Sequence, residues 1–191
     1  KIFDQADEKL NFSISKMILE GPESDLQLTK YTQPAILIVS YSIFKIMQDE
    51  FNVNMNEFKY FAGHSLGEYS ALVCSSSLSF KDSLYLLHER GKAMQEAVPL
   101  GEGKMIAVLG KKIAEIKSIT ETLNNDEVCE IANDNAEGQV IVSGSKYGVE
   151  LLEKNLKDKK IKFIPLKVSA PFHCSLMKPA AERMREKLKN I

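Results

Sequence analysis

The chain has 191 residues, of which 44% are hydrophobic, so it can bury a core as one domain or as one domain with a smaller one inserted. Its formal net charge of -1 provides no broad positive field, which argues against nucleic acid as a partner. The sequence shows no basic and then apolar leader and no apolar stretch long enough to span a bilayer, so we expect a cytoplasmic protein without membrane contact.

The cysteines and the ends of the chain add two expectations. Cys74, Cys129 and Cys174 are far apart and lack any CxxC spacing, which speaks against a disulfide framework or a zinc site and favours a reducing compartment. The chain begins at Lys1 rather than at an initiator methionine, and it ends inside a charged helical pattern over residues 183–191. We therefore expect a piece of a longer protein.

The first half of the chain predicts three helices and one strand. Apolar residues recur at helical spacing over residues 32–48, with a proline near the start. The apolar run 60–62 predicts a short strand, and residues 69–74 predict a helix directly after it. A capping box at Ser79 then opens a longer helix over residues 80–97.

Beyond a glycine linker at residues 101–103, the pattern becomes strand, helix, strand, strand, helix, strand. The strands are expected at 105–109, 128–132, 139–143 and 161–165, and the helices at 113–123 and 146–156. This order typically closes into a four-stranded antiparallel sheet with two helices on one face, the ferredoxin-like arrangement. We therefore predict an α/β fold in which residues 102–166 form a small domain inserted into a larger one made of residues 1–101 and 167–191. A cleft is expected where the two join.

The motif Gly-His-Ser-Leu-Gly at residues 63–67 lies between the predicted strand and helix. A serine framed by glycines at such a turn is typical of a nucleophile elbow, which holds the hydroxyl clear of the sheet, although an ordinary turn is the alternative. Ser65 is thus the predicted nucleophile, and the backbone N–H of Leu66 is a predicted donor to the oxyanion. We interpret His64 as shaping the turn, because adjacent residues at a sharp turn point apart.

A serine hydroxyl needs a neighbouring base, most often histidine. His173 is the predicted base, because it follows a proline-stiffened loop at the point where the chain returns to the larger domain beside the cleft. The alternative for His173 is a structural loop histidine. His88 lies on the second long helix, where we expect an exposed or merely packed side chain.

Arg90 has no acidic neighbour three or four residues away on its own helix. A buried, unpaired guanidinium is costly, so Arg90 must reach a carboxylate elsewhere, water or an anionic ligand. Its planar fork suits a substrate carboxylate. Gln33, at a helix start, either reaches the cleft or caps the helix, and the segment 133–138 predicts a hairpin loop in which one asparagine could border the cleft.

Five motifs taken in order resemble the malonyl-CoA:acyl carrier protein transacylase family over essentially the whole chain. They are TQPA at 32–35, GHSLGEYSAL at 63–72, RGKAMQEA at 90–97, NDNAEGQVIVSG at 133–144 and APFH at 170–173. The resemblance implies an α/β-hydrolase-like main subdomain with an inserted ferredoxin-like one. Two family segments lie outside this chain: an opening glycine- and glutamine-containing loop that contributes to the oxyanion hole, and a later segment that orients the histidine.

The resemblance also implies roles for the residues. Ser65 would be the acylated nucleophile, His173 its general base and acid, and Arg90 the clamp on the malonyl carboxylate. The backbone N–H of Leu66 would bind the oxyanion, and Gln33 would line the acyl pocket. Asn133 would lie near the catalytic histidine, and Phe172 would favour malonyl over methylmalonyl.

The implied reaction is ping-pong transfer of malonyl from malonyl-CoA to the phosphopantetheine thiol of acyl carrier protein, in support of fatty acid synthesis. It needs no metal and no cofactor, and it makes malonyl-CoA and acyl carrier protein the expected partners. A serine esterase or thioesterase is an alternative that would place an acid before the histidine, with Asp134 or Asp158 available. A non-catalytic domain that binds carrier protein or coenzyme A is another.

Overall fold

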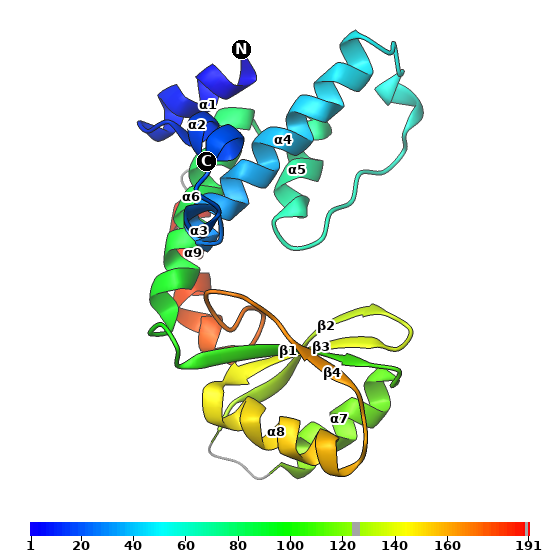
Figure 1. Ribbon diagram of the computed structural model, residues 1–191. Helices are drawn as coiled ribbons and strands as arrows, with labels where there is room; N and C mark the ends of the chain where they lie inside the picture. The colour runs from blue at the N-terminus through cyan, green and yellow to red at the C-terminus, as the bar shows by residue number, and fades with distance from the viewer. Residues whose placement is uncertain (124–126, 190) are drawn as a thin grey trace. The chain divides into compact units, whose positions relative to one another are not determined.

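The computed structural model describes residues 1–123, 127–189 and 191 (Figure 1). Their contacts divide the chain into two units, which we describe separately. Unit 1 comprises Lys1–Lys92 and Met184–Ile191, and unit 2 comprises Ala93–Arg183. Among the described residues, no helix combines the length and the apolar character needed to cross a membrane.

Unit 1 is helical in its described residues, and its core lies between its long helices. Leu37 and Ile38 of one helix and Leu84 and Leu87 of another are fully buried in that core. Ser79 caps the latter helix as predicted, since its Oγ accepts the backbone N–H of Asp82 at 3.0 Å. The helices of unit 1 are α1 (Ile2–Leu10), α2 (Ile14–Glu20), α3 (Glu23–Leu26), α4 (Thr29–Asp49), the 3-10 helix η1 (Met55–Glu57), α5 (Gly67–Cys74) and most of α6 (Phe80–Ala97).

Helix α4 begins at Thr29, three residues before the predicted start, and contains Pro34 in its second turn. Proline has no N–H, so the carbonyl of Lys30, four residues earlier, loses its helical donor. The Nδ1 of His88 donates to that carbonyl at 2.9 Å. A side chain from α6 therefore satisfies the acceptor that the proline leaves, and this bond ties α6 to the start of α4.

The predicted strand at 60–62 is absent, since the described residues supply no strand to pair with it. Tyr60 is 88% exposed. Without a ladder partner the backbone polar groups of an apolar segment turn to water instead of to a sheet. The same unit also exposes an apolar stripe of α4 at helical spacing, made of Ile36, Val39, Ile43 and Ile46.

Unit 2 contains the predicted order of four strands and two helices. The elements are β1 (Gly103–Leu109), α7 (Ile113–Thr122), β2 (Cys129–Ala136), β3 (Gln139–Ser145), α8 (Lys146–Asp158) and β4 (Phe163–Pro165). The strands form one antiparallel sheet in the order β2-β3-β1-β4. Figure 1 shows α7 and α8 on one face of this sheet, as predicted.

Alternating residues of the strands face two different clusters. Ile106, Val108, Val140 and Val142 are fully buried in the cluster that includes residues of α7 and α8. Met105, Ala107 and Ile141 form a smaller cluster on the opposite face, and Phe172 packs against it. The chain after β4 thus returns along the face of the sheet that the two helices leave open.

Two boundaries in unit 2, the end of its second strand and the start of its last helix, differ most from the prediction. Strand β2 runs on to Ala136, so the segment expected as a hairpin loop is mostly strand, and the turn is reduced to Glu137 and Gly138, the latter with φ 78°. A bulge between Ile131 and Asn133 accompanies this extension. After the 3-10 helix η2 (Ser175–Met177), helix α9 (Lys178–Leu188) begins five residues before the predicted charged helix.

Candidate functional site

Ser65 lies in a tight turn with the left-handed φ of 52° that strains any residue other than glycine. The N–H of Gly67 donates to the carbonyl of His64 at 2.8 Å, which closes the turn. A Cβ at Gly63 would collide with the backbone of Gly67 and Glu68, so the turn requires a glycine there. At Gly67 a Cβ would meet nothing within 4 Å. The elbow geometry is therefore present, although no strand precedes it in the described residues.

The Arg90 guanidinium joins two other predicted site residues. Its Nη2 donates to the Oγ of Ser65 at 3.2 Å, and its Nη1 donates to the Oε1 of Gln33 at 2.5 Å. Gln33 is 3% exposed, and its Nε2 donates to the Oγ1 of Thr29 at 2.8 Å. Both functional groups of Gln33 are thus engaged, and its carbonyl oxygen fixes one arm of the guanidinium. Gln33 is part of a partly buried chain of hydrogen bonds that reaches the serine.

A close approach of α6 to α4 makes this chain of hydrogen bonds possible. A Cβ at Gly91 would collide with the backbone of Thr29 and Lys30, so the absence of a side chain lets the two helices approach. Arg90, the preceding residue, is therefore within reach of Gln33. His88 on the same helix packs against the rings of Phe12 and Tyr31, with centroid distances of 5.4 Å and 6.2 Å. Of the two alternatives predicted for His88, an exposed or a packed side chain, the structure shows the packed one.

Burial lowers the pKa of Arg90, while the nearby Tyr69 and Glu68 act in the opposite direction. Burial raises the pKa of the Tyr69 hydroxyl, an effect that Arg90 opposes and Glu68 reinforces. Arginine keeps its charge even when buried, so the group beside Ser65 remains a cation. Glu68 and Tyr69 were not predicted as neighbours of Arg90. The available signal was their position directly after the elbow motif.

Leu66 precedes the first residue of α5 and has helical dihedral angles, φ -60° and ψ -24°. Its N–H lies at the helix N-terminus, where the first amides lack intrahelical acceptors and the helix dipole favours negative charge. His64, on the other side of the serine, is exposed. Unit 1 thus contains four of the residues that the sequence predicted for the site, Ser65, Leu66, Arg90 and Gln33, and hydrogen bonds join three of them, Ser65, Arg90 and Gln33.

In unit 2, His173 is exposed and also has a left-handed backbone, with φ 60°. The residues before it are anchored to β1. The N–H of Phe172 lies 3.3 Å from the Sδ of Met105, and a Cβ at Gly103 would collide with the ring of Pro171. The Nε2 of Gln95 donates to the carbonyl of Ser169 at 3.1 Å. The loop that carries the histidine is therefore held in place by the sheet and by α6.

Asn133 lies in β2 at the bulge, and not in the hairpin loop in which it was expected. It pairs with Ile141, and directly paired residues of an antiparallel ladder project to the same face. That face carries the cluster against which Phe172 packs. Unit 2 therefore places Asn133 and Phe172 on one side of its sheet. Ser65 belongs to unit 1 and His173 to unit 2, and their meeting remains a prediction.

Two acidic residues that an esterase mechanism would call on, Asp134 and Asp158, are both exposed. All three cysteines are free. Within residues 1–123, 127–189 and 191, no group of three or more histidine, cysteine, aspartate or glutamate side chains is placed to hold a metal ion.

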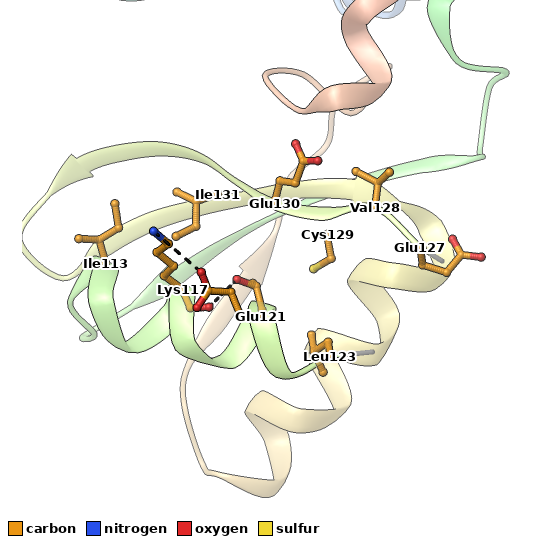
Figure 2. A pocket seen from close by; sticks show the side chains of 10 residues that line it. Ile113, Lys117, Glu121, Leu123, Glu127, Val128, Cys129, Glu130 and Ile131 are labelled. Atoms are coloured by element: carbon orange, nitrogen blue, oxygen red, sulfur yellow. Dashed lines mark hydrogen bonds and ion pairs between the residues drawn. The ribbon is translucent and has the colours of Figure 1, made fainter. Parts of the chain in front are cut away.

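A cavity of about 740 Å³ in unit 2 lies against α7 and β2 and contains none of the predicted site residues (Figure 2). Lys117 and Glu121, which form an ion pair at 3.9 Å, lie on one wall. Cys129 lines it as well, and burial, together with the charge of Glu130, raises the pKa of its thiol to about 12. An almost fully protonated thiol is a poor nucleophile, so Cys129 is not a candidate for nucleophilic chemistry.

The chain has an α/β fold in which a strained serine lies beside a fixed cation. Residues 3–191 match the family model described as "Acyl transferase domain", and the chain belongs to this family. It is 44% identical over 190 residues to the malonyl CoA-acyl carrier protein transacylase of Bacillus subtilis (strain 168). The alignment covers 98% of this chain and 59% of that protein. These matches confirm the family resemblance of the five motifs.

Solved structures are similar over the whole chain. The malonyl CoA-acyl carrier protein transacylase from Coxiella burnetii has a TM-score of 0.94 at 38% identity, with 100% of this chain and 60% of that chain covered. A structure of a type II PKS acyl-carrier protein in complex with its malonyl-transacylase has the same TM-score and identity, with 100% and 61% covered. The chain thus spans about 60% of the length of its relatives.

Proposed function

We propose that the natural protein transfers the malonyl group of malonyl-CoA to the phosphopantetheine thiol of acyl carrier protein through a malonyl ester on Ser65. The observation that carries this proposal is the guanidinium of Arg90, which bonds both Gln33 and the Oγ of Ser65. A fixed cation beside a nucleophile suits an acyl group that bears its own carboxylate. An ester hydrolase with an apolar acyl pocket gains nothing from such a charge.

The first half-reaction acylates the serine. His173 takes the proton of the Ser65 hydroxyl as the Oγ attacks the thioester carbonyl, and the N–H of Leu66 binds the resulting oxyanion. The carbon–sulfur bond then breaks, and His173 returns the proton to the leaving thiolate of coenzyme A. Arg90 exchanges its bond with the serine for bonds with the malonyl carboxylate, so the acyl group is oriented before attack.

The second half-reaction reverses these steps with a different thiol. The phosphopantetheine thiol of acyl carrier protein gives its proton to His173 and attacks the ester carbonyl, and Ser65 leaves with that proton. Around the reacting atoms, Gln33 lines the acyl pocket and Asn133 lies near the histidine. His64 shapes the turn, and Phe172 favours malonyl over methylmalonyl. No metal and no cofactor takes part.

For the architecture, we propose an α/β-hydrolase-like core formed by residues 1–101 and 167–191 and a ferredoxin-like subdomain at residues 102–166. The strand order β2-β3-β1-β4 with two helices on one face supports the second assignment. The exposed apolar stripe of α4 supports the first, because a helix that covers a sheet presents such a stripe to it.

The partners follow from the same reasoning. A relative solved in complex with an acyl-carrier protein supports a carrier protein as the acceptor, and malonyl-CoA is the donor. We propose that the reaction supplies fatty acid synthesis in the cytoplasm, to which the three free cysteines are suited. Neither nucleic acid nor a membrane is part of this function.

Mass spectrometry of the intact natural protein after mixing with malonyl-CoA tests the proposal. We expect a stable malonyl adduct that is lost in Ser65→Ala and passes to acyl carrier protein when that protein is added. Ser76→Ala is the matched control, because Ser76 is an exposed serine with a similar φ of 62°. Release of free malonate would indicate a hydrolase instead, and neither adduct nor malonate would indicate a binding domain.

A further inference from the structure

We propose that Glu130 is a positioning residue that holds the His173 loop, residues 170–175, in its working conformation. This inference rests on the proposed function, in which His173 is the base. Glu130 comes from a different element, strand β2, and lies 45 positions away from the loop residue it binds.

The contact is a clasp made of two hydrogen bonds. One carboxylate oxygen, Oε2, accepts the backbone N–H of Ser175 at 2.8 Å, and the other, Oε1, accepts the Ser175 hydroxyl at 2.6 Å. Hydrogen bonds to a carboxylate are shorter and stronger than neutral ones, and two of them on one residue fix its orientation. The clasped residue follows the histidine by two positions, at the first residue of η2.

The register of the sheet explains why Glu130 points toward this loop. Glu130 pairs with Ser143, and Ser143 pairs with Met105 on the next strand, so the three share one face. Met105 belongs to the cluster that Phe172 packs against. In Figure 2, Glu130 and Cys129 project to opposite sides of β2, as neighbouring residues of a strand do. The carboxylate therefore faces the side of the sheet along which the loop runs.

The strained backbone of His173 explains why the loop needs to be held by this clasp. A histidine with φ 60° is strained, and such a conformation persists only where its surroundings hold it. On its N-terminal side the loop is held by the contact between the N–H of Phe172 and the Sδ of Met105 at 3.3 Å. On its C-terminal side it is held by Glu130 through Ser175. The two anchors come from one sheet and bracket the histidine.

Four variants of the intact natural protein test this inference. Glu130→Ala removes both acceptors, and Ser175→Ala removes one of the two bonds. Glu130→Gln can keep both, because its oxygen accepts the Ser175 N–H while its amide donates to the hydroxyl. Glu137→Ala is the matched control, since Glu137 lies in the turn between β2 and β3, is 84% exposed and forms an ion pair with Lys112 at 3.9 Å.

Two measurements separate positioning from loss of folding. The first is the rate of malonyl transfer to acyl carrier protein. This rate is divided by the fraction of protein molecules whose Ser65 becomes malonylated after long incubation, so that unfolded protein is not counted. We expect Glu130→Ala to lower this rate by about tenfold to a hundredfold, Ser175→Ala by less, and Glu130→Gln and Glu137→Ala by under about threefold. The second is hydrogen exchange of the peptide 170–177, which we expect to quicken in Glu130→Ala alone among the glutamate variants.

The outcomes that overturn the inference differ from those that overturn the proposed function. A transfer rate in Glu130→Ala equal to that of the wild type, or an equal loss in Glu130→Ala and Glu130→Gln, rejects the positioning role of these hydrogen bonds. Absence of a malonyl adduct in the wild type rejects the proposed function. In that case the exchange measurement still decides whether Glu130 holds the loop, because unchanged exchange in Glu130→Ala shows that it does not.

Discussion

Arg90 donates a hydrogen bond to the Oγ of Ser65 at 3.2 Å, although the two residues lie 25 positions apart in the sequence. The other arm of the guanidinium is held by Gln33. The serine and the cation are thus placed together, and the proposed exchange of the hydroxyl for a substrate carboxylate as the partner of Arg90 would need little reorganisation. The residues that create this arrangement, or that stabilise unit 1, should respond to substitution in four specific ways.

Arg90→Ala is expected to lower kcat/KM for malonyl-CoA by about a hundredfold or more, because truncating one partner of a desolvated charge pair costs about 3 kcal/mol. An uncharged donor, acetyl-CoA, has no carboxylate to lose, so its transfer should fall by less than about tenfold. Steady-state kinetics with the two donors measures the difference. Equal losses with both would contradict the clamp. Arg90→Lys keeps the charge without the fork and should fall between wild type and Arg90→Ala.

Gln33→Met keeps the volume of the side chain but removes the oxygen that holds Arg90. We expect kcat/KM for malonyl-CoA to fall by about tenfold, because the guanidinium is then free to take other orientations. In a double-mutant cycle with Arg90→Ala the two losses should be less than additive, because Gln33 holds the guanidinium that the second substitution removes. Full additivity of the two effects would show that Gln33 contacts the substrate independently.

Much of this arrangement can be predicted from the sequence, and for a physical reason. The Gly-His-Ser-Leu-Gly turn is a local feature, so its residues alone fix the backbone of Ser65. The antiparallel sheet of unit 2 follows from the alternation and order of its strands, all of which lie within the described chain. The apolar neighbours of Arg90 on α6 correctly indicated that its partners come from other segments.

Contacts between distant residues that no local pattern marks could not be predicted. The clasp of Glu130 on Ser175 joins a strand to a loop 45 residues away, and nothing in the local pattern marks it. Strand β2 extends to Ala136 because β3 provides the ladder for it, although asparagine and aspartate favour turns. The strand expected at 60–62 failed for the opposite reason, because the described residues provide no strand beside it.

The two glycines of the elbow should respond differently to substitution. In Gly63→Ala the new methyl group collides with the backbone of Gly67, so we expect a loss of about 1–3 kcal/mol in the free energy of unfolding together with loss of the Ser65 adduct. Gly67→Ala adds a methyl group into open space at the start of α5, and should keep the adduct and change stability by less than about 1 kcal/mol. Urea unfolding and mass spectrometry of both variants check this. Similar damage from both substitutions would contradict the close approach at Gly63.

Glu89 is expected to make the stability of unit 1 depend on pH. Its carboxylate accepts from the Nζ of Lys92 at 3.2 Å and pairs with the Nζ of Lys187 at 3.1 Å. Burial acts to raise the pKa of Glu89, but the hydrogen bonds and charges of the two lysines outweigh it and the pKa lies below its ordinary value. The stabilisation is therefore present above the unfolded pKa and is lost as the pH falls through the folded pKa.

Glu89→Gln should consequently lower the free energy of unfolding at pH 7 by about 1.5–3 kcal/mol, the value of hydrogen bonds to a charged group. The difference in the free energy of unfolding between Glu89→Gln and wild type should shrink as the pH falls below the pKa of an ordinary glutamate, about 4.3, because protonated Glu89 resembles glutamine. Urea unfolding at pH 7 and at a pH below about 4.3 measures this difference. Glu8→Gln is the control, since Glu8 is 74% exposed and pairs with Lys81 at 3.6 Å, and it should change stability little at either pH. A difference between Glu89→Gln and wild type that stays constant with pH would assign the effect to packing instead of charge.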